Sequence, residues 1–285
     1  KINNFEDIQK YRVGRAIKVT GKLIESPADG QDFELQASEI TLEGDCEEDY
    51  PIQPKRHTRE FLREVAYLRP RTNLFQAVFR VRSIAAMAIH KYFQDKGYVY
   101  VNTPIITAND GEGAGEVFQI TTLDLDRIAL SQKVEYDKDF FGRKVGLAVT
   151  GQLEGETFAL AYKRIYTFGP TFRAENSNTK THASEFWMIE PEIAFCDLNG
   201  LMDIEEDFLK YIVKYVLDNA TVEMEFFDKF VENGLIKKLT DMLNSKSVRI
   251  SHEDAIELLK KSGKNFENEP IQGQDIAKEH EKYLT

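Results

Sequence analysis

The chain has 285 residues, of which 42% are hydrophobic and 30% are charged, and its formal net charge at pH 7 is −11. This composition is typical of a soluble globular protein with one large domain, or with a small domain beside a larger one. The acidic balance argues against indiscriminate coating of nucleic acid, which needs many Lys and Arg side chains, but it leaves room for a local basic patch that binds a structured RNA.

The two cysteines, Cys46 and Cys196, supply neither a disulfide framework nor the spacing of a metal site. We therefore expect both to be reduced thiols in a cytoplasmic protein. No stretch approaches the apolar length of a membrane span, and no signal peptide is evident. Because the chain begins at Lys1 in polar sequence, we expect it to be part of a longer protein.

Residues 14–44 contain short apolar runs separated by polar, turn-rich segments, a pattern that predicts three or four β-strands. So few strands cannot form an independent barrel. We therefore expect part of a small β-domain here. Residues 45–56 are acidic and then interrupted by Pro51 and Pro54, which predicts a linker.

Beyond this linker, hydrophobic periodicity predicts helices mixed with short strands. The predicted helices cover residues 73–96, 153–162 and 201–217. The predicted strands cover residues 98–101, 145–149, 164–175 and 185–195. A further helix should begin after Ser251, with Asp254 completing a capping box, and end at Gly263. Helices beside antiparallel strands indicate an α+β fold rather than a doubly wound parallel sheet.

The segment most informative about chemistry is FRAENSNTKTHASEFWMIEPEIAF, residues 172–195. Residues two apart in a strand share a face, so Arg173 and Glu175 point the same way on the first strand. The second strand places Phe186, Met188, Glu190 and Glu192 on one face. If the two faces coincide, one sheet surface presents a guanidinium, an aromatic ring and several carboxylates.

Such a surface has two interpretations. It can be a solvated face with ion pairs, although that reading leaves a large apolar side chain among the acids unexplained. Alternatively, the guanidinium clamps a phosphate through two parallel hydrogen bonds, the ring stacks on a purine, and a carboxylate binds an amine or ammonium group. The second interpretation suits a nucleotide and an amino acid side by side. No P-loop or dinucleotide fingerprint occurs.

At this point the sequence resembles class II aminoacyl-tRNA synthetases of the aspartyl, asparaginyl and lysyl subgroup. The FRAE strand, the loop ending in HASEF and the strand that follows are similar to motif 2 of that family. Residues 82–96 followed by GYVYVNTPII resemble motif 1, whose proline would be Pro104. YLRPRTN, residues 67–73, also fits the subgroup.

The resemblance implies a fold and a domain arrangement. The fold would be an α+β class II synthetase antiparallel sheet flanked by helices and preceded by part of an OB-fold β-barrel. Residues 1–48 would be part of the OB-fold anticodon-binding domain, residues 49–70 a linker, and residues 71–285 the catalytic domain. Motif 3, a glycine-rich segment ending in an ATP-binding arginine, is not found in the chain. We favour a partial chain over a relative that has lost the chemistry.

The resemblance also implies residue roles around ATP. Arg173 would bind the α-phosphate, and Glu175 would approach the adenine or the acceptor end of the tRNA. His182 would lie near the outer phosphates, although a loop histidine considered alone is more often not a ligand. Phe186 would stack on the adenine. Mg²⁺ would accompany ATP, with no metal ligands assigned.

Two further segments would address the amino acid. GEGAGEVF, residues 111–118, resembles the loop whose glutamate, here Glu112, helps to hold the α-ammonium group. TGQLEGE, residues 150–156, resembles the segment in which Gln152 would contact the same group. Aspartyl enzymes place a lysine against the substrate carboxylate where this chain has Gly155. Because burying an unpaired carboxylate costs several kcal/mol, a neutral amide suits the pocket better. Glu190 would accept a hydrogen bond from that amide or bind the α-ammonium.

The resemblance therefore implies an asparagine-specific member of the family. It would be a homodimer that uses ATP to convert asparagine to the adenylate and then transfers the asparaginyl group to tRNA(Asn). No membrane partner is expected. Three alternatives stay open on the sequence: an aspartyl enzyme, a synthetase-like asparagine synthetase, and a non-catalytic dimeric binding protein.

Overall fold

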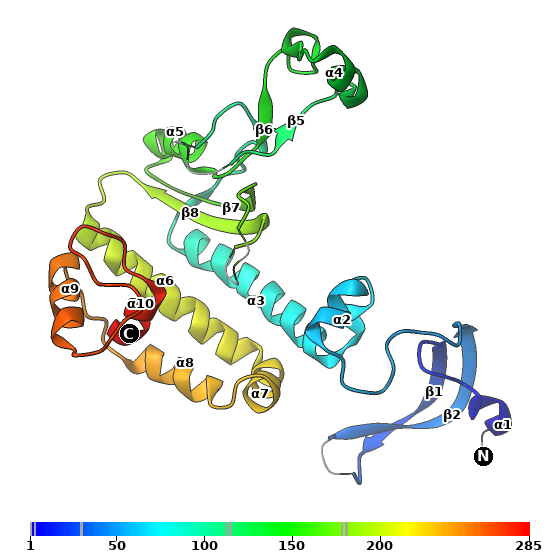
Figure 1. The fold of residues 1–285 in the computed structure, drawn as a ribbon. Coiled ribbons are helices and arrows are strands. Elements are labelled where there is room, and N and C mark those ends of the chain that lie inside the picture. Colours follow the sequence, from blue (N-terminus) through cyan, green and yellow to red (C-terminus); the bar gives the residue numbers. More distant parts are fainter. Residues whose placement is uncertain are drawn as a thin grey trace.

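The computed structural model describes residues 2, 4–28, 31–111, 113, 116–177, 179 and 182–285. It is a mixed α/β structure in which two small sheets are flanked by helices, with a β-hairpin beyond one end of them (Figure 1). The expected α+β class is thus confirmed in its coarse form. Both cysteines are free thiols, as predicted.

The N-terminal part is a short helix, α1 (Phe5–Ile8), and a hairpin of two long strands, β1 (Ala16–Glu25) and β2 (Phe33–Gly44). The strands pair antiparallel from Ala16 opposite Gly44 to Glu25 opposite Phe33. The prediction of three or four strands is wrong. Its apolar runs belong to two continuous strands, and a two-stranded sheet by itself is not a barrel.

Gly21 explains the wrong division of β1. The register shifts between Thr20 and Gly21, which marks a bulge inside the strand rather than a turn. A Cβ on Gly21 would lie 2.4 Å from the carbonyl oxygen of Gln36 on the opposite strand. Glycine is therefore required here by a close approach of two backbones.

The segment between the hairpin and the main body is only partly extended linker. Helix α2 (Arg59–Glu64) begins at Thr58, whose hydroxyl accepts a hydrogen bond from Phe61 N at 3.2 Å. A 3₁₀ turn, η1 (Arg69–Arg71), then leads into α3 (Asn73–Asp95). The predicted linker 49–70 thus contains a short capped helix.

Helix α3 packs against the sheet and against α6 (Leu198–Asn219) through a mostly aromatic core. Phe93 stacks on Tyr166 with ring centroids 4.6 Å apart, and Tyr92 contacts Phe208 at 5.1 Å. The Tyr92 hydroxyl also donates to Asp207 at 2.8 Å. The predicted helix 73–96 is confirmed, and its apolar spacing is explained by this buried face.

The main sheet has the order β3 (Val99–Tyr100), β7 (Arg164–Phe172) and β8 (Glu185–Ile193). Strands β7 and β8 are antiparallel, but β3 runs parallel to β7. The main sheet is therefore mixed, and the expectation of a purely antiparallel sheet is corrected. The predicted strand ends also extended too far, because Phe195 adopts a left-handed conformation with φ of 61°.

A second, antiparallel sheet has the order β4 (Ile106–Thr107), β6 (Val145–Leu147) and β5 (Gln119–Ile120). It is joined to the main sheet by a hydrogen bond from Phe172 N to the carbonyl oxygen of Ala148 at 2.9 Å. Helix α5 (Gln152–Tyr162) follows β6 and covers β7. A long connection between β5 and β6 contains α4 (Leu125–Ser131) and a 3₁₀ turn, η2 (Tyr136–Lys138).

The remaining residues are mostly helical. They form α7 (Thr221–Phe230), α8 (Leu235–Asn244), α9 (His252–Lys261) and α10 (Lys278–Leu284). Ser251 caps α9 by accepting from Asp254 N at 3.1 Å, and its hydroxyl donates to the Asp254 carboxylate at 2.7 Å. Within the described part of the chain, no helix combines the length and the apolar character needed to cross a membrane.

Candidate active site

The pairing of β7 with β8 brings the predicted site residues onto one surface. Thr171 lies opposite Phe186, and Thr167 lies opposite Glu190. Directly opposite residues share a face of the sheet. Arg173 follows two residues after Thr171, and its guanidinium carbon lies 5.5 Å from the centre of the Phe186 ring. The two predicted faces therefore coincide, which the sequence had left open.

We call this surface of β7 and β8 the front face, and it comprises Thr167, Thr171, Arg173, Phe186, Met188, Glu190 and Glu192. The opposite face packs on α3 and α6, and on it Phe168 and Trp187 are in edge contact at 5.2 Å. Charge on the front face is separated. Arg173 and Phe186 lie at one end, while Glu190 and Glu192 begin four residues further along β8, about 13 Å away at the usual strand rise.

Glu190 is held by three donors on neighbouring segments. It accepts hydrogen bonds from the hydroxyl of Thr150 and, at 2.7 Å, from the hydroxyl of Thr167. The backbone N–H of Gly151 lies 3.1 Å from each of its carboxylate oxygens. Four acceptor positions are thereby used, which is about the capacity of a carboxylate. In this geometry Glu190 fixes the Thr150–Gly151 turn at the start of α5.

That turn in turn positions Gln152, the first residue of α5. Its backbone N–H donates to the Thr150 hydroxyl at 3.1 Å, and its side-chain amide donates to Glu156 at 3.1 Å. Gln152 is half-buried. The Gln152 predicted from TGQLEGE therefore lies beside Glu190, on the acidic end of the front face.

The glycine-rich segment that begins at Gly111 passes next to this turn. Gly111 has φ of +62°, and a Cβ there would lie 2.7 Å from side-chain carbons of both Val149 and Thr150. Only glycine fits such a conformation and approach. The predicted ligand Glu112 lies outside the described residues, so its role stays a prediction.

Arg173 is anchored at the junction of the two sheets. Its Nε donates to the carbonyl oxygen of Val149 at 3.3 Å, and its backbone N–H donates to Ser184 O at 3.1 Å. Glu175 and His182 are exposed in the loop beyond β7. His182 Nδ1 is paired with the hydroxyl of Thr179. The described contacts bring Arg173 and Phe186 together but connect neither residue to Glu175 or His182.

A cavity of about 140 Å³ lies between residues 100–105 and the front of the sheet, with Gly151, Thr167 and Glu190 on its wall. This volume is below the range that holds a drug-sized ligand. A larger cavity of about 1130 Å³ lies far along the chain from the front face, between the linker and α7. We assign the site from the front face because the larger cavity contains none of the predicted residues.

Among the carboxyl groups of the site, Glu192 has a raised pKa. Burial raises its pKa from the usual 4.5 to about 6, and the neighbouring carboxylates Glu156 and Glu190 act in the same direction. Glu192 also lies close to Gly155, since a Cβ on that glycine would be 3.6 Å from Glu192 Cγ. The surroundings of Gly155 are thus acidic, and the described residues around it include no cation.

Replacing Glu192 by glutamine should change how stability depends on pH. Because the folded pKa is the higher one, the wild-type carboxyl stabilises the fold below pH about 4.5, and this contribution is lost as pH rises through about 6. Glu192→Gln should therefore be the more stable protein at pH 7.5, by up to about 1 kcal/mol after allowance for solvent screening. Urea unfolding at pH 5 and pH 7.5 measures this difference, and an equal effect at both pH values would contradict it.

Sequence reasoning missed the residues that hold Glu190. Thr167 could have been found by aligning the two predicted strands as a hairpin, which places it opposite Glu190. Thr150 and Gly151 could not, because their contact depends on how β6 and α5 approach β8. Within the described ranges, no group of three or more His, Cys, Asp or Glu side chains is arranged to hold a metal ion.

Comparison with known proteins gives the family. Residues 58–285 match the family described as tRNA synthetases class II (D, K and N). The chain belongs to this family. Among its relatives, the asparagine–tRNA ligase of Acholeplasma laidlawii (strain PG-8A) is 62% identical over 284 residues, which are 99% of this chain and 61% of the relative. The asparagine–tRNA ligase of Clostridium novyi (strain NT) is 54% identical over 287 residues, 100% of this chain and 62% of the relative. The chain thus spans about three fifths of these class II synthetases.

Solved structures of the family share the fold. The asparaginyl-tRNA synthetase of Pyrococcus horikoshii, complexed with asparaginyl-adenylate, matches with a TM-score of 0.79 and 25% identity over 98% of this chain and 58% of that one. A putative aspartyl-tRNA synthetase from Leishmania major Friedlin matches with a TM-score of 0.71 and 19% identity over 94% of this chain and 56% of that one. The class II fold therefore does not distinguish asparagine from aspartate.

Proposed function

We propose that this chain contains the amino-acid-activating site of an asparagine–tRNA ligase. The observation that carries this proposal is the front face, where, among the described residues, Arg173 and an aromatic ring are separated from an acidic pocket that has no cation. Relatives named asparagine–tRNA ligase that are 62% and 54% identical support the same activity.

The specificity argument rests on the surroundings of Gly155. A substrate β-carboxylate placed here would face Glu190, Glu192 and Glu156 without a positive partner, and burying such a charge costs several kcal/mol. An amide carries no charge, and its NH₂ group can donate to a carboxylate. A site built around such a hydrogen bond can discriminate by roughly 10⁴-fold.

We propose that the same face binds ATP and the α-ammonium group of the amino acid. Phe186 stacks on the adenine of ATP, and Arg173 donates to its α-phosphate. Gln152 and Glu112 hold the α-ammonium group, while Glu175 lies toward the adenine or the tRNA end and His182 toward the outer phosphates. The contacts of Glu190 support a positioning role, in which it holds the turn that presents Gln152.

The chemistry then needs no covalent enzyme intermediate. The asparagine carboxylate oxygen attacks the α-phosphorus, the bond to the β-phosphate oxygen breaks, and pyrophosphate leaves. Arg173 stabilises the charge that develops on the α-phosphate oxygens. The 3′-hydroxyl of the terminal tRNA ribose next attacks the adenylate carbonyl, and AMP leaves. We expect Mg²⁺ with ATP, but the described residues offer no metal cluster, so we assign it no ligands and no step.

The tRNA partner is supported by a basic segment in an otherwise acidic chain. Residues 55–71 contain six Lys or Arg residues and two Glu residues. None of the six forms an ion pair with another described residue. Unpaired cations on a surface are what neutralises phosphates on RNA. This segment also borders the 1130 Å³ cavity.

Three further features belong to the proposal. The β1–β2 hairpin is part of an OB-fold anticodon-binding domain, because its strands expose apolar side chains such as Leu23 and Phe33 that further strands would cover. The protein is a homodimer, which the exposed Met87, Ile105 and Ile106 near motif 1 support. It acts in the cytoplasm, where its free cysteines stay reduced.

Amino-acid-dependent ATP–pyrophosphate exchange on the full-length protein tests the proposed function. We expect exchange with asparagine and at least 10³-fold less with aspartate. Exchange with aspartate instead would show that the pocket contains a cation outside the described residues. A folded protein that exchanges with neither amino acid would favour the non-catalytic alternative.

Introducing a cation at residue 155 should weaken the preference for asparagine. Gly155→Lys places an ammonium group beside Glu192, and we expect the ratio of asparagine to aspartate exchange to fall by about tenfold or more. Gly155→Ala is the matched control, because its Cβ meets Ile165 at 3.3 Å without adding charge. Equal ratios in the two variants would contradict the charge argument.

A further inference from the structure

The connection between β5 and β6 forms an arm, residues 121–144, that stands away from both sheets (Figure 1). Its base is the antiparallel pair in which Gln119 lies opposite Gly146 and Ile120 opposite Val145. Strand β6 ends at Leu147, and two residues later the carbonyl oxygen of Val149 accepts a hydrogen bond from Arg173. On the other side of the base, the carbonyl oxygen of Glu116 accepts a hydrogen bond from the backbone N–H of Ala174 at 2.8 Å, so both chain segments at the base of the arm lead to the front face.

The two ends of the arm are tied together by Asp139. Its carboxylate accepts from the Thr121 hydroxyl at 2.6 Å, from Thr122 N and its hydroxyl at 2.9 Å each, and from Phe140 N at 2.8 Å. These bonds, with that of Thr121 the largest cause, hold the pKa of Asp139 at about 2. The carboxylate stays charged at neutral pH, so the start of residues 140–144 is fixed against residues 121–122.

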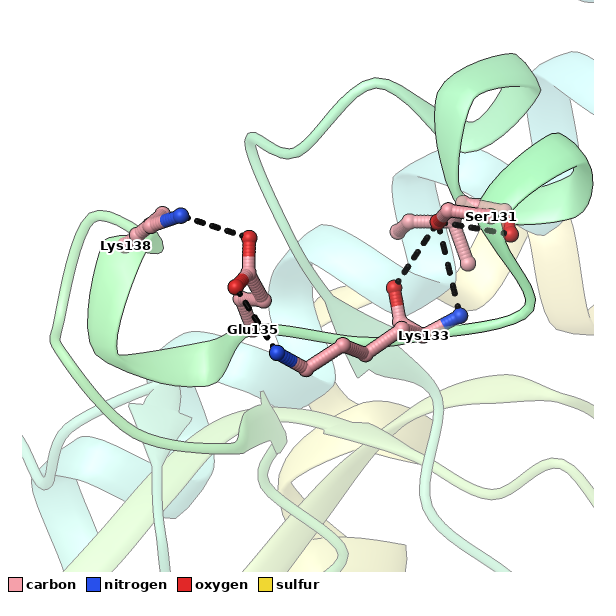
Figure 2. A network of polar contacts seen from close by, with 5 residues as sticks. Ser131, Lys133, Glu135 and Lys138 are labelled. Carbon is pink, nitrogen blue, oxygen red and sulfur yellow. Dashed lines mark hydrogen bonds and ion pairs between the residues drawn. The ribbon is translucent and has the colours of Figure 1, made fainter.

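A second network braces the middle of the arm. Figure 2 shows Glu135 between Lys138, at 2.7 Å, and Lys133, at 3.0 Å. Ser131 closes the end of α4 by hydrogen bonds to the backbone of Lys133. The charges of Lys133 and Lys138 are therefore partly neutralised within the arm.

The segment FFGRK, residues 140–144, exposes both its aromatic rings and its cationic side chains to solvent. Phe140 is 76% exposed and Phe141 is 47% exposed, with their rings edge to face at 4.8 Å. Arg143 and Lys144 are exposed and form no ion pair with the described residues. We call these four side chains the arm patch.

We propose that the arm patch binds the single-stranded 3′ end of the tRNA, which rests on the proposed function. Exposed aromatic rings that stack on bases, next to cations that contact phosphates, are the combination by which proteins hold single-stranded nucleic acid. The 3′ end must also approach the adenylate. Lys144 is five residues from Val149, about 17 Å at the usual strand rise.

The side chains favour RNA over a second copy of the chain. Lysine is depleted from protein–protein interfaces, whereas Lys144 lies within a few residues of the two rings. The chain as a whole carries a net charge of −11, so an RNA strand near it needs local cations that are not already paired. The arm patch supplies two of them beside the site.

Variants of the full-length protein test the proposal. Phe140→Ala/Phe141→Ala and Arg143→Ala/Lys144→Ala are compared with Leu130→Ala, a control on the same arm whose side chain is 88% exposed. We expect kcat/KM for a tRNA(Asn) transcript in aminoacylation to fall about 10- to 100-fold in the aromatic variant. In the basic variant, the slope of the logarithm of the binding constant against the logarithm of the salt concentration should become smaller in magnitude by about 1.4. This is the change expected for the loss of two phosphate contacts to a single strand. Leu130→Ala should behave as wild type.

Two additional readouts separate this proposal from the proposed function. ATP–pyrophosphate exchange reports asparagine activation alone, so a variant that loses exchange and aminoacylation equally would overturn a role in tRNA binding. A wild type without exchange would overturn the proposed function, and direct binding of the labelled transcript would still test the arm patch. Unchanged tRNA binding in both double variants would overturn the proposal. A shift from dimer to monomer on sedimentation would instead identify the arm patch as an interface between copies.

Discussion

Replacing Arg173 by alanine should lower asparagine-dependent ATP–pyrophosphate exchange by about 100-fold or more. The guanidinium is the only cation on the front face among the described residues, and its place beside Phe186 is fixed by bonds to Val149 and Ser184. Removing one preorganised donor to a developing oxyanion typically costs about 10²- to 10³-fold in rate. The measurement is kcat for exchange at saturating ATP and asparagine.

Two companion variants make this result specific. Arg173→Lys keeps the charge but loses the planar pair of donors, so its activity should lie between those of wild type and Arg173→Ala. Arg164→Ala removes an exposed arginine from the other end of the same strand and should leave exchange within about twofold. Wild-type exchange in Arg173→Ala would remove Arg173 from the mechanism.

Replacing Glu190 by glutamine should raise KM for asparagine by about 10- to 100-fold. The amide cannot accept from Thr150, Gly151 and Thr167 as the carboxylate does. Hydrogen bonds to charged groups contribute about 1.5–3 kcal/mol, and each 1.4 kcal/mol is tenfold in binding. Because the Thr150–Gly151 turn would move, Gln152 would no longer be presented to the amino acid. Steady-state exchange kinetics with varied asparagine measure the effect.

The control for Glu190 is on the same strand. Glu185→Gln changes an exposed glutamate at the start of β8 and should leave KM unchanged. Thr167→Val removes one of the donors to Glu190 without altering its charge, and a smaller rise in KM is expected. An unchanged KM in Glu190→Gln, with the fold intact by circular dichroism, would contradict the positioning role.

Much of the fold was predictable because its signals are local. The apolar face of α3 and the cap at Ser251 depend on residues three and four apart in the sequence. Both features are present in the structure where the sequence predicts them. The β1–β2 hairpin was divided wrongly because Gly21 looks like a turn until the opposite strand is present. The parallel pairing of β3 with β7 joins residues more than 60 positions apart, and no local pattern specifies it.

Part of the candidate site was likewise predictable from local sequence patterns, and part was not. Alternation along each strand was sufficient to place Arg173 on one face of its strand and Phe186 with Glu190 on one face of the other. That these two faces coincide follows only from the register of the pair. The contacts of Thr150 and Gly151 with Glu190 and the raised pKa of Glu192 depend on how α5 packs over the sheet, which the sequence does not reveal. The arm patch was missed because FFGRK carries no periodicity, and the exposure of its side chains depends on the tertiary structure.

The central claim is that the front face holds asparaginyl-adenylate, and the most direct test is a crystal structure of the full-length protein with a non-hydrolysable sulfamoyl analogue of that adenylate. We predict the adenine stacked on Phe186, the Arg173 guanidinium within hydrogen-bond distance of the sulfamoyl group, and the asparagine amide beside Gly155. An analogue bound elsewhere, such as in the 1130 Å³ cavity beside α7, would contradict the account.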